Sequence, residues 1–235
     1  MAGLNKAYKR RPSMVSMNGG PVLCLDAGSK LSYPGTGTTW TDLSGNGNNG
    51  TLTNGPTFDS TNGGSLVFNG SNQYAELTNA ANDLVDFTVC CMFKTTQTSV
   101  GLLVSKLVNY GSGAGWGLFL SNGSVRLILQ QNGSQWGVYY TAGGYANGLW
   151  HYAAAVISGR TLSAMYVDGV AKSTTLTAGT AWTSYSNAVP IRIGTDALPE
   201  FFFTGNIAVP QVYNRALSAT EISTNFELLR GRYGI

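Results

Sequence analysis

The chain reads FTVCCMFK at residues 87–94 and VRLILQ at residues 125–130. The alternating sets are Phe87, Val89, Cys91, Phe93 against Thr88, Cys90, Met92, Lys94, and Val125, Leu127, Leu129 against Arg126, Ile128, Gln130. Side chains two residues apart lie on the same face of a β-strand. Both stretches therefore predict strands, and the density of such stretches predicts two stacked antiparallel sheets.

Short strand-like runs continue along most of the chain, separated by turn signals. Nine Asn-Gly dipeptides and Asp168-Gly169 punctuate the sequence, and these residues tolerate the positive φ angles of tight hairpin turns. We expect an all-β fold with further strands at Val22–Asp26, Ser65–Asn69, Gln73–Leu77, Val100–Val108, Trp116–Ser121, Trp136–Thr141, Trp150–Ile157, Leu162–Val167, Val170–Leu176, Ile191–Gly194 and Asn206–Tyr213.

The composition supports a globular β protein. Gly, Ser, Thr and Asn supply 95 of 235 residues, and charged residues only 11%, against about 25% in an average globular chain. The hydrophobic share of 43% allows a sizeable core, which excludes a disordered chain. No run of about 18 apolar residues is present, so we expect no membrane span and no membrane partner.

The positive charge is concentrated at the N-terminus. Residues 1–25 hold four basic residues and no acid, whereas the rest of the chain holds 10 basic and 11 acidic residues. A nearly neutral body argues against nucleic-acid binding, which requires a basic face on the fold itself. We therefore predict a basic N-terminal arm over residues 1–20 and one domain over residues 21–235.

One helix is expected close to the C-terminus. Ser218 followed by Glu221 forms a capping-box pattern. Ile222, Phe226 and Leu229 then recur at helical spacing. Gly231 is predicted to end the helix, and its apolar stripe is predicted to pack on the sandwich.

The three cysteines do not suggest a disulfide framework. Cys90 and Cys91 are adjacent, so they point to opposite faces of a strand and cannot readily pair. Cys24 leaves an odd count without metal-site spacing. We expect three buried free thiols in a chain made in a reducing cytoplasm.

Several ordered blocks resemble one family. The chain resembles laminin-G-like, concanavalin A-like lectin/glucanase domains from residue 22 to about 235, and this resemblance implies a jelly-roll sandwich. The same sequence blocks also resemble those of lectin-like domains in virion proteins of tailed bacteriophages. This resemblance implies a structural or adhesive role. The matching blocks are LDAG at 25–28, WTDLSGNGNNGTL at 40–52, FNGSNQY at 68–74, FTV at 87–89, WHY at 150–152, YVDG at 166–169, IG at 193–194, VYNRALS at 212–218 and EI at 221–222.

Catalytic chemistry has little support in the sequence. His151 is the single histidine, and no Gly-x-Ser-x-Gly motif is present to supply a serine nucleophile. No glutamate has a second acid at strand spacing, as the carboxylate pair of a glycoside hydrolase requires. We expect no enzyme and no catalytic residues, and a strand histidine hydrogen-bonded to a neighbour; a glycoside hydrolase is the third-ranked alternative.

The resemblance implies calcium as a candidate ligand, because several laminin-G-like domains bind it. Asp42 and Asn46 are the candidate ligands, whereas calcium usually takes six to eight oxygen ligands. The alternative is that Asp42 and Ser44 cap a turn. Residues 207–211, where many relatives carry acids, hold none, so the expected metal and cofactor set is none, with calcium the exception.

Aromatic and amide side chains suggest a glycan site. Tyr110, Trp116 and Trp136 are the candidate stacking residues, with Gln130 and Gln131 as hydrogen-bonding partners. The alternative is that these aromatic residues pack within the core or along a sheet edge.

The arm and one aromatic patch are candidate partner contacts. Lys6, Tyr8, Lys9, Arg10 and Arg11 could order on an acidic surface, and Phe202 lies in a run of three phenylalanines that cannot all face one core. Together with the phage-like resemblance, this predicts a non-enzymatic capsid decoration or cement protein, in the virion, bound to the major capsid protein or other virion subunits and forming a homo-oligomer. The alternative is a carbohydrate-binding adhesin that recognises host-surface glycan.

Overall fold

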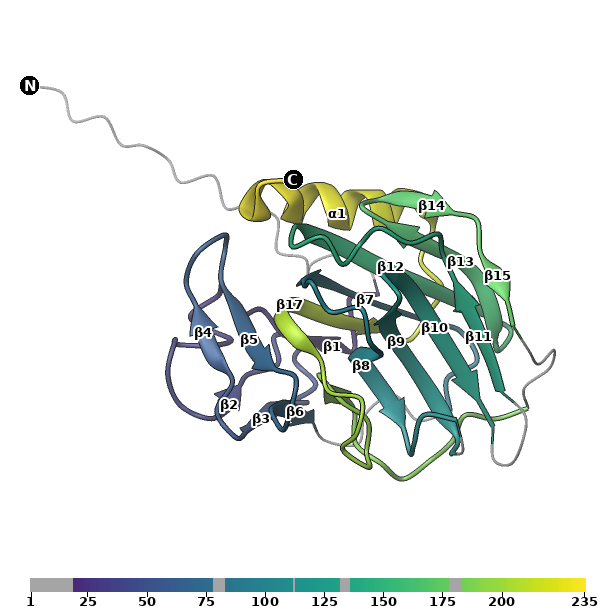
Figure 1. Cartoon of the computed structure of the whole chain (residues 1–235), viewed down its shortest axis with the longest axis horizontal. Coiled ribbons are helices and arrows are strands. Elements are labelled where there is room, and N and C mark those ends of the chain that lie inside the picture. The colour runs from purple at the N-terminus through teal and green to yellow at the C-terminus, as the bar shows by residue number, and fades with distance from the viewer. Residues whose placement is uncertain (1–18, 78–82, 112, 132–135, 178–182) are drawn as a thin grey trace, which may run out of the picture.

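Two antiparallel β-sheets face each other and one helix covers the outside of the first (Figure 1). The computed structural model describes residues 19–77, 83–111, 113–131, 136–177 and 183–235. In this part of the chain no helix is long and apolar enough to cross a membrane. The jelly-roll sandwich predicted from the sequence is confirmed.

The eight-stranded sheet runs in the order β14-β13-β12-β7-β17-β5-β4, with β1 paired to β17. Sequence neighbours pair in hairpins, and β7 is flanked by the distant strands β12 and β17. Its strands are β1 (Leu23–Cys24), β4 (Thr57–Asp59), β5 (Ser65–Asn69), β7 (Phe87–Lys94), β12 (Trp150–Ser158), β13 (Thr161–Val167), β14 (Val170–Lys172) and β17 (Thr204–Tyr213).

The nine-stranded sheet runs in the order β15-β11-β10-β9-β8-β16-β6-β3-β2. Its middle is a meander of four strands, β8 to β11, each paired to the next along the chain. Its strands are β2 (Thr39–Trp40), β3 (Gly50–Thr53), β6 (Tyr74–Leu77), β8 (Gly101–Leu107), β9 (Gly115–Ser121), β10 (Ser124–Gln130), β11 (Trp136–Tyr140), β15 (Thr175–Leu176) and β16 (Arg192–Ile193).

The strand at residues 87–94 is apolar on both faces because it contributes to two cores. Phe87 and Cys91 belong to the core between the two sheets. Cys90 and Met92 belong to a second core on the outside of the eight-stranded sheet. The predicted alternation is therefore present, and the two adjacent cysteines do point to opposite faces, as free buried thiols.

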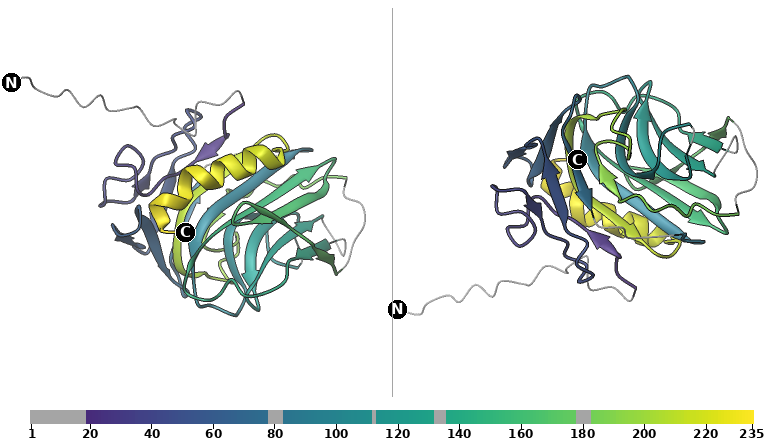
Figure 2. Two further views of the ribbon diagram at one scale, coloured as in Figure 1. Left: turned by 90° about the horizontal axis from the view of Figure 1, so that it is seen from above. Right: turned by 90° about the horizontal axis from the view of Figure 1, so that it is seen from below.

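Helix α1 (Ala219–Tyr233) supplies the other half of this second core. Ile222, Phe226 and Leu229 are buried, and Trp150 of β12 lies 4.6 Å from Tyr233 between ring centroids. Figure 2 shows the helix lying across the eight-stranded sheet, on the side away from β8–β11. The predicted packing of the apolar stripe on the sandwich is confirmed.

The start of the helix matches the sequence prediction and its end does not. Ser218 and Glu221 form the capping box. The helix continues past Gly231 to Tyr233 and ends at Gly234, whose φ of 74° is left-handed. Gly231 was the wrong stop because the packing of Tyr233 on Trp150 adds a turn that helix-end signals do not encode.

Two hairpin turns need residues that accept a positive φ. Asn122-Gly123 joins β9 to β10 with φ angles of 51° and 70°, and Asp168-Gly169 joins β13 to β14 with 54° and 73°. A Cβ on Gly169 would also lie 2.7 Å from a ring carbon of Phe226. Both turns are confirmed, and Gly169 is required twice, by its backbone angle and by the helix packed over it.

The predicted strand Val170–Leu176 is two strands in different sheets. Val170–Lys172 pairs with β13 in the eight-stranded sheet, and Thr175–Leu176 pairs with β11 in the nine-stranded sheet. The chain crosses between the sheets at Ser173-Thr174. The short strands β2, β3 and β4 were not predicted, since two to four residues give too little alternation to recognise.

The basic arm and its boundary at residue 20 stay a prediction. Lys6, Tyr8, Lys9, Arg10 and Arg11 all lie outside the described residues. The described chain begins at Gly19, whose carbonyl accepts a hydrogen bond of 3.0 Å from the Arg215 guanidinium.

The capping box predicts a specific loss of stability. Hydrogen bonds from Arg215 and Ser218 lower the pKa of the Glu221 carboxyl from 4.5 to about 2. Because this pKa is depressed in the folded state, the stabilisation is complete above pH 4.5 and is lost as the pH falls toward 2. We expect Glu221→Ala to lower the free energy of unfolding at pH 7 by about 1–2 kcal/mol, measured by urea denaturation.

Glu227 is the matched control, because it lies in the same helix and pairs with Arg230 at the exposed surface. Glu227→Ala is expected to change stability by less than about 0.5 kcal/mol. Equal losses for the two variants, or a Glu221→Ala loss that persists at pH 2, would contradict the assignment.

Candidate functional site

The outer face of the nine-stranded sheet carries an apolar cluster that no helix covers in the described chain. Inward residues of β9–β11 fill the main core. The alternate positions turn outward and gather into a separate group. Its buried members are Leu102, Leu107, Phe119, Ile128 and Val138.

Two loops fold over part of this cluster and bring aromatic rings to it. Tyr110, from the loop after β8, lies 5.4 Å from Phe119 and 5.0 Å from Phe201 between ring centroids. Phe201 belongs to the loop before β17. Tyr110 and Phe201 are both half-buried, so each ring keeps an exposed part.

Polar side chains hold these loops in place. The buried Asp196 carboxylate accepts the backbone N–H of Tyr110 at 3.1 Å and that of Glu200 at 3.3 Å. Burial raises the pKa of this carboxyl. Gln130 accepts the N–H of Gly111 at 3.0 Å and donates to the Asn109 carbonyl at 3.2 Å. Tyr110 is therefore positioned by fixed hydrogen bonds rather than by packing alone.

Arg126 lies beside Tyr110 on the same face. It is paired directly with Tyr140 of β11 and Phe119 of β9 in the ladder, and its guanidinium lies 5.2 Å from the centre of the Tyr140 ring. Burial raises the pKa of the Tyr110 hydroxyl, and the Arg126 charge acts on it in the opposite direction. We call this group the Tyr110–Arg126–Tyr140 surface.

The Arg126 guanidinium is incompletely satisfied. Its Nε is buried and has no hydrogen-bond partner in the part of the chain that the structure describes. A half-buried cation stacked on one half-buried tyrosine, with a second half-buried tyrosine on the same sheet face, offers flat apolar surface, hydroxyl groups and N–H donors together. This combination suits a ligand that has both C–H faces and acceptor oxygens.

The three predicted glycan residues have different positions. Tyr110 lies on this surface. Trp116 is 2% exposed and packs 5.2 Å from Phe87 in the core between the sheets, so its prediction as a stacking residue is wrong. Trp116 shares its strand face with Leu118 and Leu120 and points inward with them. The backbone of Trp136 pairs with Gln130, and its side chain lies outside the description.

The two predicted amide partners hold the loops of this region. Both groups of the Gln130 amide are used within the fold. Gln131 accepts hydrogen bonds from the N–H and hydroxyl of Thr183. Both side-chain amides are therefore engaged within the fold, and we do not expect them to hydrogen-bond a ligand.

Residue Phe202 is half-buried between two neighbours that pack in opposite cores. Phe203 is fully buried between the sheets and Phe201 packs on the outer cluster. The expectation that the three rings cannot share one core is confirmed. A partner contact through Phe202 stays a prediction.

The loop that holds Asp42 and Asn46 does not fit a calcium ion. Both Asp42 oxygens already accept two hydrogen bonds each, from the N–H of Cys24 and Ser44 and from the Ser44 hydroxyl and the Asn48 N–H. The Asn46 amide donates to the Val22 carbonyl. Within the described ranges no group of three acidic, histidine or cysteine side chains could hold a metal. The calcium candidate is therefore corrected to the turn cap.

His151 is satisfied by its neighbours, as expected. Its Nδ1 lies 2.8 Å from an oxygen of Asp168 and its Nε2 lies 3.1 Å from the Asn147 side-chain oxygen. The second Asp168 oxygen accepts the N–H of Tyr152. This network ties β12 to the Asp168-Gly169 turn.

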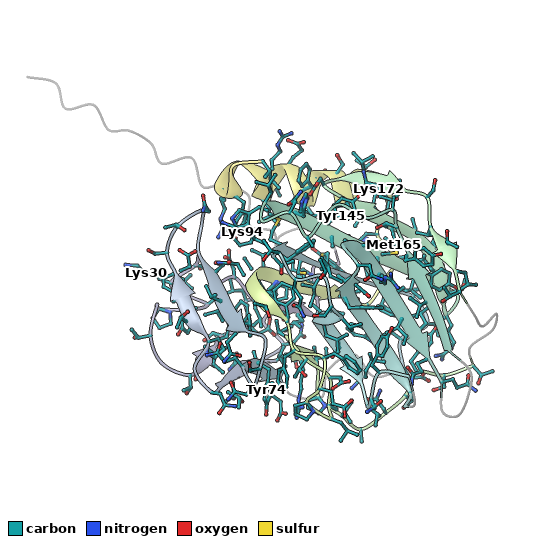
Figure 3. The ribbon with its side chains drawn as sticks, viewed as in Figure 1. Lys30, Tyr74, Lys94, Tyr145, Met165 and Lys172 are labelled. Carbon is teal, nitrogen blue, oxygen red and sulfur yellow. The ribbon has the colours of Figure 1, made fainter. Side chains whose placement is uncertain are left out.

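Two other half-buried tyrosines, Tyr74 and Tyr145, lie in different parts of the molecule. Figure 3 shows Tyr74 at the lower edge of the molecule and Tyr145 in its upper half. Tyr74 stacks on Arg192, 4.7 Å from the ring centre, and Arg192 is in turn held by Glu76 and two backbone carbonyls. Arg126, by contrast, forms no ion pair with any described residue, stacks on Tyr140 and acts electrostatically on Tyr110.

Sequence reasoning did not single out Arg126. The alternation of residues 125–130 places it on the face opposite Val125, with Ile128. What distinguishes Arg126 is the lack of a nearby carboxylate, and that depends on which distant loops meet this face.

The fold and one sequence comparison agree on the family. The profile of the Concanavalin A-like lectin/glucanases superfamily, in its Laminin_G_3 branch, matches residues 69–223. The chain belongs to this family. None of the curated proteins compared with the chain matches it.

Solved structures with the same fold share little sequence with this laminin-G-like chain. Domain 4 of an extracellular arabinanase from Geobacillus stearothermophilus, in complex with arabinotriose, has a TM-score of 0.65 at 17% identity, over 89% of this chain and 98% of that one. The ligand-binding domain of botulinum neurotoxin serotype D, in complex with N-acetylneuraminic acid, has 0.68 at 14%, over 91% and 52%. A Trypanosoma rangeli sialidase with the inhibitor DANA has 0.62 at 18%, over 89% and 33%. The chain therefore spans about half the length of the toxin domains that it matches.

The turn-cap role of Asp42 makes a prediction about calcium. Asp42→Ala leaves buried N–H groups without acceptors, and we expect it to lower the free energy of unfolding by about 2–3 kcal/mol. Calcium or EDTA is expected to leave the Tm of the wild-type protein unchanged in differential scanning fluorimetry. A Tm increase with calcium that Asp42→Ala abolishes would contradict the cap and restore the metal site.

Proposed function

We propose that this chain is a non-catalytic carbohydrate-binding domain that holds glycan on the Tyr110–Arg126–Tyr140 surface. The observation that carries the proposal is the half-buried Arg126 guanidinium, which stacks on the half-buried Tyr140 ring and lies close enough to Tyr110 for its charge to act on that hydroxyl, on a sheet face that no helix covers in the described chain. Tyrosine rings stack on the apolar faces of sugars, and N–H groups read the sugar oxygens. Surfaces that combine aromatic rings with polar donors in this way suit sugars.

The comparisons support this choice among the roles that the sequence suggested. The arabinanase domain carries arabinotriose, and the match covers 98% of its length. The serotype D toxin domain carries N-acetylneuraminic acid. These ligands belong to those proteins, and they favour a sugar as the ligand class for the laminin-G-like chain.

The carboxylates next to this surface support binding without hydrolysis. A glycoside hydrolase needs one acid and one base or nucleophile on either side of the scissile bond. Both oxygens of Asp196 accept backbone N–H groups that hold the loops, so this carboxylate serves the fold. Glu200 alone cannot supply both roles.

The virion role is a proposal that rests on the sequence. A capsid decoration or cement function is inferred from the basic residues of the arm and from the resemblance of the domain's sequence to virion proteins of tailed bacteriophages. It is compatible with glycan binding, because the arm could anchor a domain whose outer sheet face remains open.

Substitution of the tyrosines tests the glycan-binding proposal. We expect Tyr110→Ala and Tyr140→Ala each to weaken binding to the best glycan on an array at least about ten-fold, or about 1.4 kcal/mol, measured by isothermal titration calorimetry. The rings contribute stacking area that no neighbour replaces.

Tyr74→Ala is the matched control, because Tyr74 also stacks on an arginine of the same sheet, but that arginine is ion-paired to Glu76. We expect Tyr74→Ala to leave glycan affinity unchanged. Equal loss in all three variants, or no loss in the first two, would contradict the proposed surface.

Removal of residues 1–18 separates the two roles. We expect the shortened chain to keep its glycan affinity, because the proposed surface uses no residue of the arm. If the arm is the anchor, the shortened chain no longer co-sediments with phage particles while full-length chain does. Retained co-sedimentation would contradict the anchoring role of Lys6, Tyr8, Lys9, Arg10 and Arg11.

A further inference from the structure

Five of the six arginines in the described part of the chain are paired with carboxylates. Among the residues that the structure describes, five arginines form ion pairs, with N–O distances of 2.6–3.2 Å. Arg126 forms none there. The paired arginines are Arg160, Arg192, Arg215, Arg230 and Arg232.

The pairing of Arg192 shows what Arg126 lacks. Both arginines lie in the nine-stranded sheet and both stack on a tyrosine, at 4.7 Å for Arg192 and 5.2 Å for Arg126. Arg192 donates to Glu76 through two nitrogens and to two backbone carbonyls. Arg126 donates no hydrogen bond to another described residue. Its Nε is buried and unsatisfied, which is unfavourable, and its two terminal nitrogens are the donors that a ligand can reach.

The nearby acids do not fill this gap. Asp196 and Glu200 lie in the loop that packs beside Tyr110. Neither is within ion-pair distance of Arg126 in the structure. Both carboxylate oxygens of Asp196 already accept hydrogen bonds from backbone N–H groups. The positive charge of Arg126 is thus left on the proposed sugar-binding surface, flanked by the hydroxyl of Tyr110 and the ring of Tyr140.

We infer that Arg126 selects glycans that carry a carboxylate, such as sialic-acid or uronic-acid residues. This inference rests on the proposed function and names its ligand class. The planar guanidinium donates two parallel hydrogen bonds to a carboxylate. The partly buried position strengthens this pairing relative to an exposed lysine, because water screens it less.

The test begins with an array of neutral, sulfated, sialylated and uronic-acid glycans. We expect the bound glycans to carry carboxylates, and the strongest of them to lose at least about ten-fold in affinity when its carboxylate is converted to the methyl ester. The ester keeps the sugar ring and removes the charge. Affinity for the free acid is expected to fall as sodium chloride is raised.

Arg126→Gln and Arg126→Lys separate charge from hydrogen-bond geometry. We expect Arg126→Gln to bind the acid and its methyl ester equally, and Arg126→Lys to keep part of the preference because it keeps the charge without the planar pair of donors.

Lys30→Gln removes an exposed cation outside this surface and is expected to leave both affinities unchanged. Thermal unfolding of Arg126→Gln checks the fold, and we expect no loss of Tm because the substitution removes an unsatisfied buried N–H.

The outcomes separate the carboxylate selectivity of Arg126 from the proposed glycan-binding function. Neutral or sulfated glycans bound in preference to carboxylated ones, or binding of the acid that Arg126→Gln leaves unchanged, overturns the carboxylate selectivity. If such binding is still lost in Tyr140→Ala, the glycan-binding function stands. No binding to any glycan on the array overturns both.

Discussion

Every other feature of this molecule depends on how its sheet faces are covered. A two-sheet sandwich has four faces, and apolar burial between the sheets uses two of them. Helix α1 covers a third, on the outside of the eight-stranded sheet, through Ile222, Phe226 and Leu229. The fourth face, the outside of β8–β11, has no helix over it in the described chain, and the loops that carry Tyr110 and Phe201 pack on its buried apolar cluster.

The loops that reach this face are also what makes it specific. Tyr110 is held there by Asp196, and the loop after it is fixed by Gln130. Rigid hydrogen bonds of this kind reduce the entropy lost when a ligand binds. The same arrangement accounts for the buried Asp196 carboxylate, whose pKa is raised by burial while its oxygens serve two backbone N–H groups.

Local signals in the sequence predicted the elements well. Capping by Ser218 and Glu221, the turn at Asp168-Gly169 and the alternation at residues 87–94 act between near neighbours in the chain, so the sequence alone was enough. Signals that depend on distant packing were missed. Gly231 and Gly234 are equivalent as helix stops until Tyr233 packs on Trp150.

The residues of the candidate site also include some that the sequence could predict and some that it could not. The strand face of Trp116 was predictable, because it alternates with Leu118 and Leu120 on the inward side, yet residue type alone suggested exposure. The importance of Arg126 was not predictable, since it depends on carboxylates elsewhere in the chain being committed to other arginines.

Both ends of the described chain lie behind the eight-stranded sheet. Gly19 contacts Arg215, which pairs with Glu221 at the start of α1, and the chain finishes just after the same helix. Figure 2 shows this helix on the opposite side of the sandwich from β8–β11. A particle, surface or second domain fused at either end would therefore lie on the α1 side of the module, away from the outer face of β8–β11 on which glycan binding is proposed.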